Sequence, residues 1–437
     1  MCVKVFAWDL MHILSFNKID LELYFKHIKK ESNDAMQKVR SYCGRLSKVG
    51  FVLLLVCMNV IGQQQDEPKQ QRPRIVATPT PPKQITSNNQ SIEVDDGDVV
   101  RVDTQLVNVP TVVYDQMGRP LTNLKADNFI VYEDGQKQQL SNFATAETPF
   151  EVALLLDTSG STQEQIEMIR RAAKSFISAL REGDRVAIVA FNKRPNGGKN
   201  LSVVDVISRL TNNRDVLEMT LERIGASAGT PYYDGVARIM DEIFYKPSSS
   251  EMRGRRAIVA LTDGVDSVSE KEFADIRARL QSVDVACYFI QVNTENFVED
   301  RLLLDCEDRA VLVLSKEQLN RYRRNFDPKA DPEDYYDFCR LGKFQRMDIS
   351  HKLYQLARKE MNELSLSSGG KIFPVESLRE AQSAFTQVAK EIGTQYSLGY
   401  YPTNQKRDGS FRTIRVEIKG IKGTSIRARE GYHAPKS

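Results

Sequence analysis

Asp157, Ser159 and Ser161 occur in one short stretch, directly after the apolar run 152–156. One carboxylate and two hydroxyls offer hard oxygen atoms, which suit Mg²⁺, Mn²⁺ or Ca²⁺. The apolar run has the length and composition of a buried parallel strand, and an amphipathic helix pattern follows it over about 162–180. Because ligands of α/β proteins bind where strands end and helices begin, we expect these oxygens to face a binding site.

Two later residues extend this set, since Mg²⁺ requires about six oxygen ligands. Thr230 precedes Pro231, which fits the first position of a helix, so we expect Thr230 at the N-cap with its hydroxyl facing the site. Asp263 ends a third apolar strand pattern at 256–262, and Gly264 permits a tight turn there. The three loops belong at the carboxyl edge of a parallel sheet, where their oxygens can converge.

Each of these residues also has an ordinary structural interpretation. Ser161 and Glu164 have the spacing of a capping box, and Asp263 could belong to a simple turn. Asp266 and Asp234 are interpreted as structural, although Asp234 could support the site as an outer partner. Taken together, the positions favour a metal site.

The complete set resembles the metal-ion-dependent adhesion site of von Willebrand factor type A domains. For this chain the resemblance implies that Ser159, Ser161 and Thr230 coordinate the metal directly or through water. It implies that Asp157 and Asp263 act partly through water and orient the hydroxyls. The implied cofactor is Mg²⁺, or alternatively Mn²⁺ or Ca²⁺. The implied partner is a protein or cell-surface ligand whose Asp or Glu carboxylate completes the metal's coordination.

The resemblance covers about 150–393, with a long insertion at 295–349 as a departure from the family pattern. The flanking segments 112–135, 396–402 and 429–432 are similar to exported von Willebrand-related proteins that are common in Acidobacteria.

Repeated strand–helix units over 149–394 predict an α/β domain with a doubly wound, mostly parallel, Rossmann-like sheet. Short alternating strands over 95–148 and 395–437 are each too few to form a stable domain. We therefore predict one small β-sandwich, built from N- and C-terminal strands and split in sequence by the α/β domain. Two separate small sheets are the alternative.

The insertion 295–349 is dense in both charge signs, and so long a connection is usually functional or disordered. A solvated decoration without function is the other interpretation. Cys306 and Cys339 fall within it and could pair in an oxidising compartment, but the sequence does not show their distance. Cys287 lies in an apolar strand and is predicted to be a buried, inert thiol.

The N-terminal region 1–62 predicts export. Arg45 and Lys48 precede the apolar segment 49–61, which fits a signal peptide cleaved after Gly62; an uncleaved membrane anchor is the alternative. The true start could be Met36, which would open a normal basic region. Residues 63–94 have the polar, proline-containing composition of a flexible linker. We expect a periplasmic, envelope or extracellular protein that contacts a membrane only if the signal remains uncleaved.

Composition and charge exclude several function classes. A formal net charge of +3 and the absence of a basic, aromatic-rich run argue against nucleic-acid binding. The four histidines are scattered, and no catalytic constellation is evident, so we do not expect an enzyme. We expect an adhesion-type binding module. The alternatives are a Mg²⁺-dependent phosphoryl-transfer enzyme and a structural envelope protein without an acidic ligand.

Overall fold

The computed structural model describes residues 106–436 except 161–162, 247–253 and 309. Several predictions fall outside the described residues: those for the N-terminal region 1–62, the linker 63–94, the strand pattern before 106, and Ser161. Within the described ranges, none of the helices is both long enough and apolar enough to cross a membrane.

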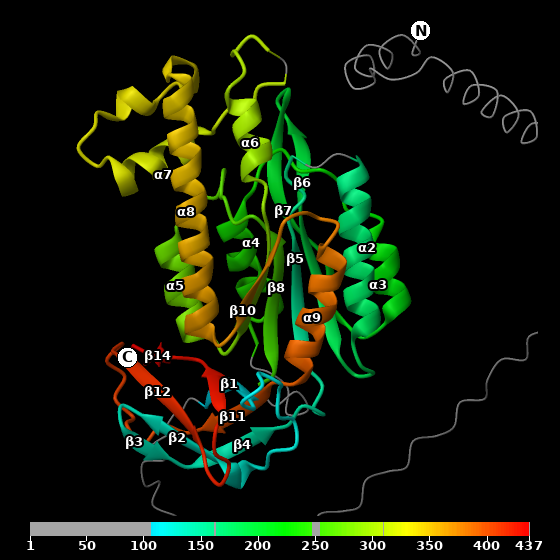
Figure 1. Cartoon of the computed structure of the whole chain (residues 1–437), viewed down its shortest axis with the longest axis vertical. Helices are drawn as coiled ribbons and strands as arrows, with labels where there is room; N and C mark the ends of the chain where they lie inside the picture. The colour runs from blue at the N-terminus through cyan, green and yellow to red at the C-terminus, as the bar shows by residue number, and fades with distance from the viewer. Residues whose placement is uncertain (1–105, 161–162, 247–253, 309, 437) are drawn as a thin grey trace, which may run out of the picture. The chain divides into compact units, whose positions relative to one another are not determined.

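A six-stranded sheet forms the centre of the α/β part (Figure 1). Its strands are β5 (Glu151–Leu156), β6 (Arg185–Asn196), β7 (Lys199–Thr211), β8 (Arg256–Thr262), β9 (Ala286–Val292) and β10 (Lys371–Val375). Their order is β10-β9-β8-β5-β6-β7, and neighbours are parallel except β6 with β7. The predicted α/β fold with a mostly parallel sheet is confirmed.

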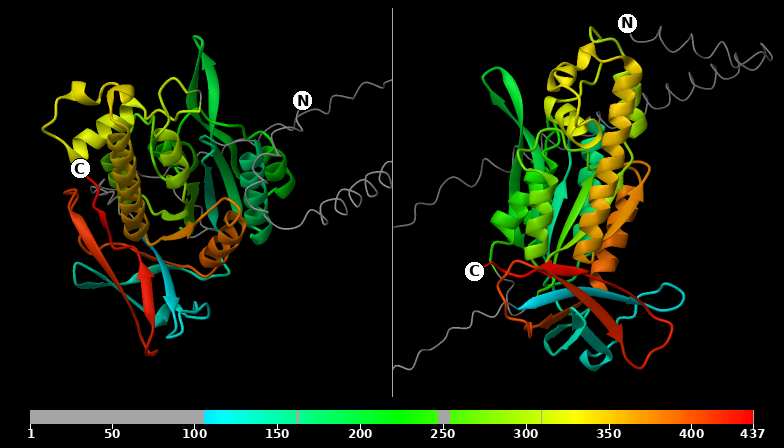
Figure 2. Two further views of the ribbon diagram at one scale, coloured as in Figure 1. Left: turned by 45° about the horizontal axis from the view of Figure 1, so that its top comes forward. Right: turned by 90° about the vertical axis from the view of Figure 1, so that its left-hand side faces the viewer.

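Helices cover both faces of this sheet (Figures 1 and 2). They are α2 (Gln163–Ala179), α3 (Arg214–Leu221), α4 (Tyr232–Arg238) continued by the π-helix η4 (Ile239–Ile243), α5 (Phe273–Ser282), α8 (Lys343–Ser368) and α9 (Ala381–Gly393). Successive residues of β5 point to opposite faces. Leu154 and Leu156 pack in the core beneath α2, α3 and α9, whereas Leu155 packs beneath α4, α5 and α8. All six residues of β5 are buried for this reason.

The strand β7 was not predicted from the sequence. It forms a long antiparallel hairpin with β6, and the two-residue turn is Gly197-Gly198, both with positive φ. A Gly-Gly pair between runs rich in β-branched residues is a typical hairpin signal, so the sequence did contain the information. The hairpin closes one edge of the sheet.

Strands from both ends of the described chain form two further antiparallel sheets. The first has the order β13-β1-β11-β4 and the second β14-β12-β2-β3. The strands are β1 (Val107–Tyr114), β2 (Phe129–Glu133), β3 (Gln136–Gln138), β4 (Leu140–Ala144), β11 (Tyr396–Tyr400), β12 (Phe411–Ile418), β13 (Ser425–Ala428) and β14 (Gly431–His433), with a 3-10 turn η3 (Ala126–Asn128) before β2. Both sheets contribute to one hydrophobic core, in agreement with the predicted sandwich.

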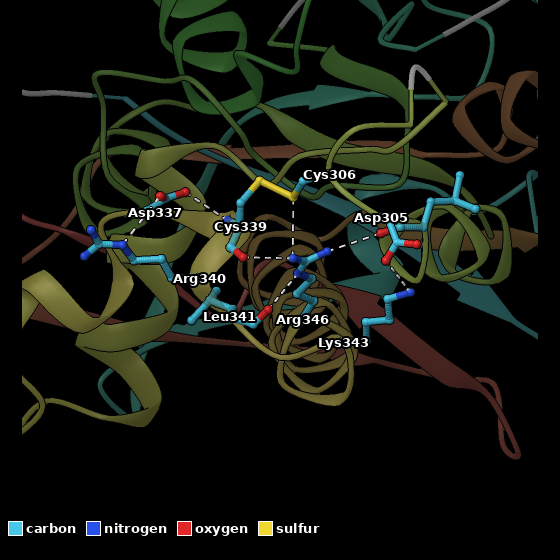
Figure 3. The surroundings of a disulfide bond; sticks show 9 residues. Asp305, Cys306, Asp337, Cys339, Arg340, Leu341, Lys343 and Arg346 are labelled. Carbon is cyan, nitrogen blue, oxygen red and sulfur yellow. Dashed lines mark hydrogen bonds and ion pairs between the residues drawn. A yellow bond between two sulfur atoms is a disulfide. The ribbon is translucent and has the colours of Figure 1, made fainter.

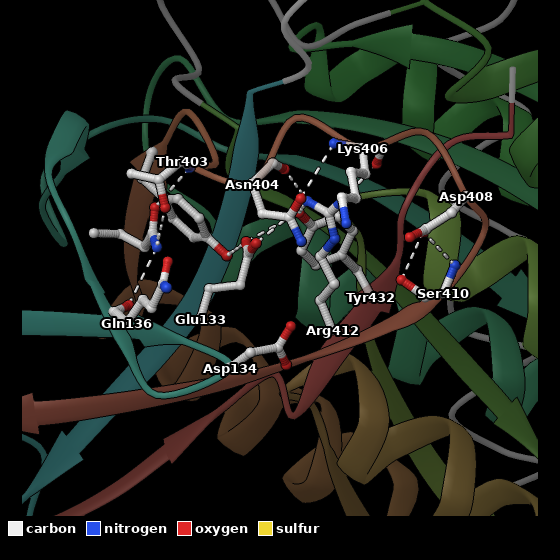
Figure 4. Close-up of polar contacts among 12 residues, drawn as sticks. Glu133, Asp134, Gln136, Thr403, Asn404, Lys406, Asp408, Ser410, Arg412 and Tyr432 are labelled. Atoms are coloured by element: carbon white, nitrogen blue, oxygen red, sulfur yellow. Dashed lines mark hydrogen bonds and ion pairs between the residues drawn. The ribbon is translucent and has the colours of Figure 1, made fainter.

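A buried charged network joins the two sheets of the sandwich (Figure 4). Glu133 and Arg412, 2% and 3% exposed as side chains, form an ion pair at 3.3 Å. Glu133 Oε2 also accepts hydrogen bonds from the hydroxyls of Tyr400 and Tyr432, at 2.8 and 3.0 Å. Because its oxygens are paired and hydrogen-bonded, the buried carboxylate is tolerated in the core.

The sandwich contacts the amino ends of the central strands. Asp284, which precedes β9, accepts hydrogen bonds from Asn108 at 3.0 Å and from Arg429 at 2.6 Å. Arg255, which precedes β8, donates to the carbonyls of Thr148 and Ile392. These contacts leave the carboxyl edge of the sheet, where the candidate ligands were predicted, clear of the sandwich.

The connection between β9 and β10 is folded into a packed subdomain rather than a solvated loop. It contains α6 (Glu295–Leu302), α7 (Lys316–Phe326), the 3-10 turns η5 (Pro332–Tyr335) and η6 (Phe338–Arg340), and the beginning of α8. These elements share a hydrophobic core of their own that includes Leu302, Leu319, Tyr335, Phe338 and Leu353.

A disulfide between Cys306 and Cys339 ties this insertion together (Figure 3). Beside it the Arg346 guanidinium, on a residue only 5% exposed, donates to the carbonyls of Leu304, Cys339 and Leu341. Backbone groups that would otherwise be unpaired are thereby satisfied. Cys287 is buried and free, as predicted, and burial raises the pKa of its thiol to about 12.

Replacing both Cys306 and Cys339 with serine is expected to loosen the insertion while the central sheet stays intact. A disulfide typically contributes about 2–4 kcal/mol. Amide hydrogen exchange should therefore increase over 302–346 and remain unchanged in β5 and β8. Dithiothreitol should produce the same change in the wild-type protein and none in the variant. Unchanged exchange in the insertion would show that its hydrophobic core alone holds it.

Candidate metal centre

The first loop of the site follows β5. Asp157 continues the sheet with one hydrogen bond, from its N–H to the Leu261 carbonyl at 3.0 Å. Its Oδ1 accepts from the Ser159 N–H at 2.9 Å, and its Oδ2 accepts from the Thr262 hydroxyl at 2.7 Å. Gly160 has φ 57°, which permits the sharp turn into α2. These bonds hold the Asp157 carboxylate at the carboxyl edge of the sheet.

The second loop, 225–231, lies against the first. The Ser227 N–H donates to the Thr158 carbonyl at 3.1 Å, and Ser159 and Ser227 form a parallel β-bridge. Thr230 is 6% exposed, so its side chain is buried in this loop. The N-cap of α4 is Pro231, so the prediction that Thr230 caps the helix was wrong by one position. The Thr230 hydroxyl is therefore not used in capping.

The third loop follows β8 and contacts the second. Asp263 Oδ1 accepts from the Val265 N–H at 2.9 Å. Thr230 and Ser267 exchange two hydrogen bonds, from the Thr230 N–H to Ser267 Oγ at 2.8 Å and from the Ser267 N–H to the Thr230 carbonyl at 3.0 Å. All three loops are thus linked directly, although about 70 and then about 30 residues separate them in sequence.

Four of the five predicted ligand residues line one cavity of about 750 Å³: Asp157, Ser159, Thr230 and Asp263. The fifth, Ser161, lies outside the described residues. Asp234 and Asp266 do not line the cavity. Asp234 accepts from the backbone N–H groups of Glu270 and Lys271, and Asp266 accepts from those of Tyr233 and Ser269. Both carboxylates therefore hold loops together, as the structural interpretation expected.

The two site carboxylates are electrostatically uncompensated. Burial, and then the negative charge of Asp263, raise the pKa of Asp157 to about 7. Burial also raises the pKa of Asp263. Neither carboxylate forms an ion pair with any described residue, although buried charges are normally paired. Carboxylate and hydroxyl oxygens that converge without a basic partner fit a divalent cation well.

Tyr354 and Thr294 belong to the site but were missed in the sequence. The Thr294 hydroxyl donates to Asp263 Oδ2 at 2.5 Å, and the Tyr354 hydroxyl lies 3.4 Å from the same oxygen and 2.7 Å from Thr294. Thr294 follows β9, and residues that directly follow parallel strands lie at the same edge of the sheet, so its place in the site could have been predicted. Tyr354 comes from α8, and nothing in its sequence neighbourhood connects it with Asp263.

Replacing Tyr354 with phenylalanine is expected to weaken Mg²⁺ binding about tenfold, since outer partners that orient metal ligands commonly have effects of this size. The ring still fills its buried position, so the thermal stability of the metal-free protein should change little. Isothermal titration with Mg²⁺ measures the effect. Tyr336→Phe, at an exposed tyrosine of the insertion, is the matched control. Equal affinities for the two variants would remove Tyr354 from the site.

The comparisons with known proteins agree with this architecture. Residues 151–318 match the family model of the von Willebrand factor type A domain. The chain therefore contains a von Willebrand factor type A domain, carried with two small antiparallel sheets from its N- and C-terminal strands. No curated protein matches the chain significantly.

Several solved structures are similar to the chain at low identity. An aerotolerance-related membrane protein from Bacteroides fragilis has 18% identity over 55% of this chain and 99% of its own, with a TM-score of 0.31. A von Willebrand factor type A protein from Catenulispora acidiphila has 13% identity over 77% and 75%, with a TM-score of 0.33. Three N-terminal domains of the type V pili tip protein Mfa5 from Porphyromonas gingivalis have 16% identity over 40% and 30%, with a TM-score of 0.23. These similarities are too remote to transfer a ligand or a partner.

Proposed function

We propose that this chain is a divalent-cation-dependent binding protein that recognises an acidic group on a protein or cell-surface ligand. The observation that carries the proposal is the pair of buried carboxylates, Asp157 and Asp263, which lack a basic partner among the described residues and share a cavity with the Thr230 hydroxyl. The match to a von Willebrand factor type A domain supports it.

Each residue has a distinct role in this proposal. The hydroxyls of Ser159, Ser161 and Thr230 hold Mg²⁺, or alternatively Mn²⁺ or Ca²⁺, directly or through water. Asp157 and Asp263 balance its charge and orient the hydroxyls. The cation itself supplies a strongly electrophilic centre. Because neutral hydroxyls neutralise it poorly, a partner's Asp or Glu carboxylate gains strongly by binding there.

We favour binding over catalysis. Among the described residues that line the cavity there is no histidine, lysine or cysteine, so Ser159 has no base of the usual kind to activate it as a nucleophile. A Mg²⁺-dependent phosphoryl-transfer enzyme is the alternative. A phosphatase assay with Mg²⁺ decides between them: turnover that Asp157→Asn abolishes would establish the enzyme.

We also infer that the protein is exported and belongs with the exported von Willebrand-related proteins that its flanking segments resemble. The disulfide between Cys306 and Cys339 supports export, because such bonds persist in oxidising compartments. Mass spectrometry of the mature N-terminus tests whether the signal is removed after Gly62.

Affinity capture from cell-envelope extracts tests the proposed function. The immobilised protein is incubated with extract in Mg²⁺, in Mn²⁺ and in EDTA. We expect specific proteins or surface polymers to be retained with cation and released by EDTA. Retention that is equal in EDTA would instead indicate a structural envelope protein whose metal site has no acidic ligand.

A further inference from the structure

The insertion converts the metal edge of the sheet into a walled cavity. Four apolar side chains of the insertion line this cavity and are called the apolar wall here: Phe297, Val298, Leu312 and Val313. Met168 of α2 and Leu378, which precedes α9, line the cavity as well. Phe297 and Val313 are 43% and 54% exposed, so they present apolar surface in the same cavity as the polar oxygens of the candidate metal site. A cavity of this size holds a ligand of several residues or a drug-sized molecule.

The wall is held firmly in place. Leu314, directly after Val313, is buried in the core of the insertion. Ser315 then caps α7 through the Gln318 N–H at 3.1 Å, and its hydroxyl donates to the Ser267 carbonyl at 2.5 Å. Ser267 Oγ in turn accepts a hydrogen bond from the Thr230 N–H, so Ser315 and Ser267 connect this end of the apolar wall to the loop of a proposed metal ligand. A fixed wall costs little ordering entropy when a ligand binds.

The buried hydroxyl of Ser350 is a second, independent observation that points to a ligand. It lies on α8, lines the cavity and is 1% exposed, yet its hydroxyl has no hydrogen-bond partner among the described residues. Unpaired buried hydroxyls are uncommon and unfavourable. A serine has one side-chain dihedral angle, so this hydroxyl can turn toward a polar atom seated in the cavity. The cavity thus offers a cation site, an apolar wall and a hydrogen-bonding group.

We propose that this cavity binds a short extended peptide segment in which an aspartate or glutamate is followed by an apolar residue. This inference rests on the proposed function. The acidic side chain meets the cation beside Thr230, the following apolar side chain packs on Phe297 and Val313, and a backbone amide group pairs with Ser350. The specificity therefore lies in the insertion, because the apolar wall comes from it.

A pooled peptide library tests the sequence preference. The peptides have the form acetyl-Gly-(Asp or Glu)-Xaa-Xaa-Gly-amide, with every residue except cysteine at Xaa, and binding to the full chain is measured with Mg²⁺ and with EDTA. We expect the Mg²⁺-dependent binders to be enriched in Leu, Ile, Val, Met and Phe directly after the acidic residue. Binders with no apolar preference, or no binders at all, overturn the inference. If hexanoate competes for the cavity as well as the best peptide does, the ligand is an aliphatic carboxylate and not a peptide.

Two exposed wall residues test where the preference arises. Phe297→Ser and Val313→Ser should each weaken the best apolar peptide about tenfold and leave the matching Asp-Ser peptide unchanged, because each substitution removes one apolar contact of ordinary size. Phe344→Ser, at a phenylalanine of α8 that is 88% exposed and does not line the cavity, is the control. Uniform losses for both peptides would place the apolar subsite elsewhere.

Ser350→Ala separates a ligand contact from a structural role. Peptide affinity should fall about fivefold to tenfold, while the melting temperature of the free protein stays equal or rises, since an unpaired buried hydroxyl is removed. Ser397→Ala is the matched control: this serine of β11 is also 1% exposed with an unpaired hydroxyl, but it does not line the cavity. A lower melting temperature with unchanged peptide affinity would assign Ser350 a structural role.

The failures of the two proposals are distinguishable. If envelope capture depends on Mg²⁺ but the library shows no apolar preference, the proposed function stands and the peptide specificity is wrong. If neither assay responds to Mg²⁺, both fail.

Discussion

Asp157→Ala is expected to abolish Mg²⁺-dependent ligand binding, with a loss of affinity of at least about 100-fold, which corresponds to about 2.7 kcal/mol. In the proposed site the carboxylate would balance the cation's charge, and its hydrogen bond from the Ser159 N–H holds the loop that would supply the hydroxyl ligands. Thr230→Ala should have a similar effect, because it removes a proposed ligand. Thr230→Ser should retain part of the binding. Surface plasmon resonance against a captured envelope ligand, or the best library peptide, measures all three.

Asp300→Ala is the matched control, since it removes an exposed carboxylate from α6 and leaves the cavity lining unchanged. Circular dichroism must show a native spectrum for every variant. The metal-free Asp157→Ala protein should be at least as stable as the wild type, because a buried, uncompensated charge is removed. An unfolded variant would assign Asp157 a structural role, and unchanged cation-dependent binding by a folded one would remove it from the site.

Stability in the absence of metal is expected to fall as the pH rises from about 4 to about 7. Burial and the neighbouring Asp263 raise the pKa of the Asp157 carboxyl from its ordinary 3.8 to about 7. The folded state therefore binds this proton more tightly than the unfolded state. The stabilisation is complete below the unfolded pKa and is lost as the pH passes through the folded pKa.

Urea unfolding in EDTA at pH 5 and pH 8 measures this change, with Asp157→Asn as the control for all other titrating groups. The wild type should lose more stability between these pH values than the variant does. Mg²⁺ should stabilise the wild type more at pH 8 than at pH 5, because the cation replaces the proton. Equal pH dependence in wild type and variant would show that Asp157 titrates normally and that the site is not electrostatically strained.

Local patterns predicted the elements that carry the site. Residues 152–156 form a fully buried central strand because an uninterrupted apolar run suits a sheet covered on both faces. Asp157, Thr230 and Asp263 were predicted to meet because parallel strands end at the same edge, and the structure places them around one cavity. The Thr230 cap was misplaced by one residue: proline favours the first helical position, which would leave Thr230 at the cap, but Pro231 is itself the N-cap.

Contacts between distant segments could not be predicted in the same way. Sequence patterns report which face of an element is buried, but they do not show which distant side chain packs against that face. The insertion was therefore undecided between a functional element and a decoration, although its apolar residues build a core and its two cysteines pair. For the same reason Tyr354, which is 91 residues from Asp263 in sequence, became a member of the site only in the fold.

The sequence by itself determined the α/β class, the carboxyl-edge location of the candidate site and the oxygen chemistry of that site, because each depends on short-range periodicity or residue type. The tertiary structure decided the shape of the cavity, the apolar wall that includes Phe297 and Val313, and the unpaired hydroxyl of Ser350. These features depend on how α8 and the insertion pack against the loops that hold Asp157, Thr230 and Asp263. Such packing is a property of the whole fold.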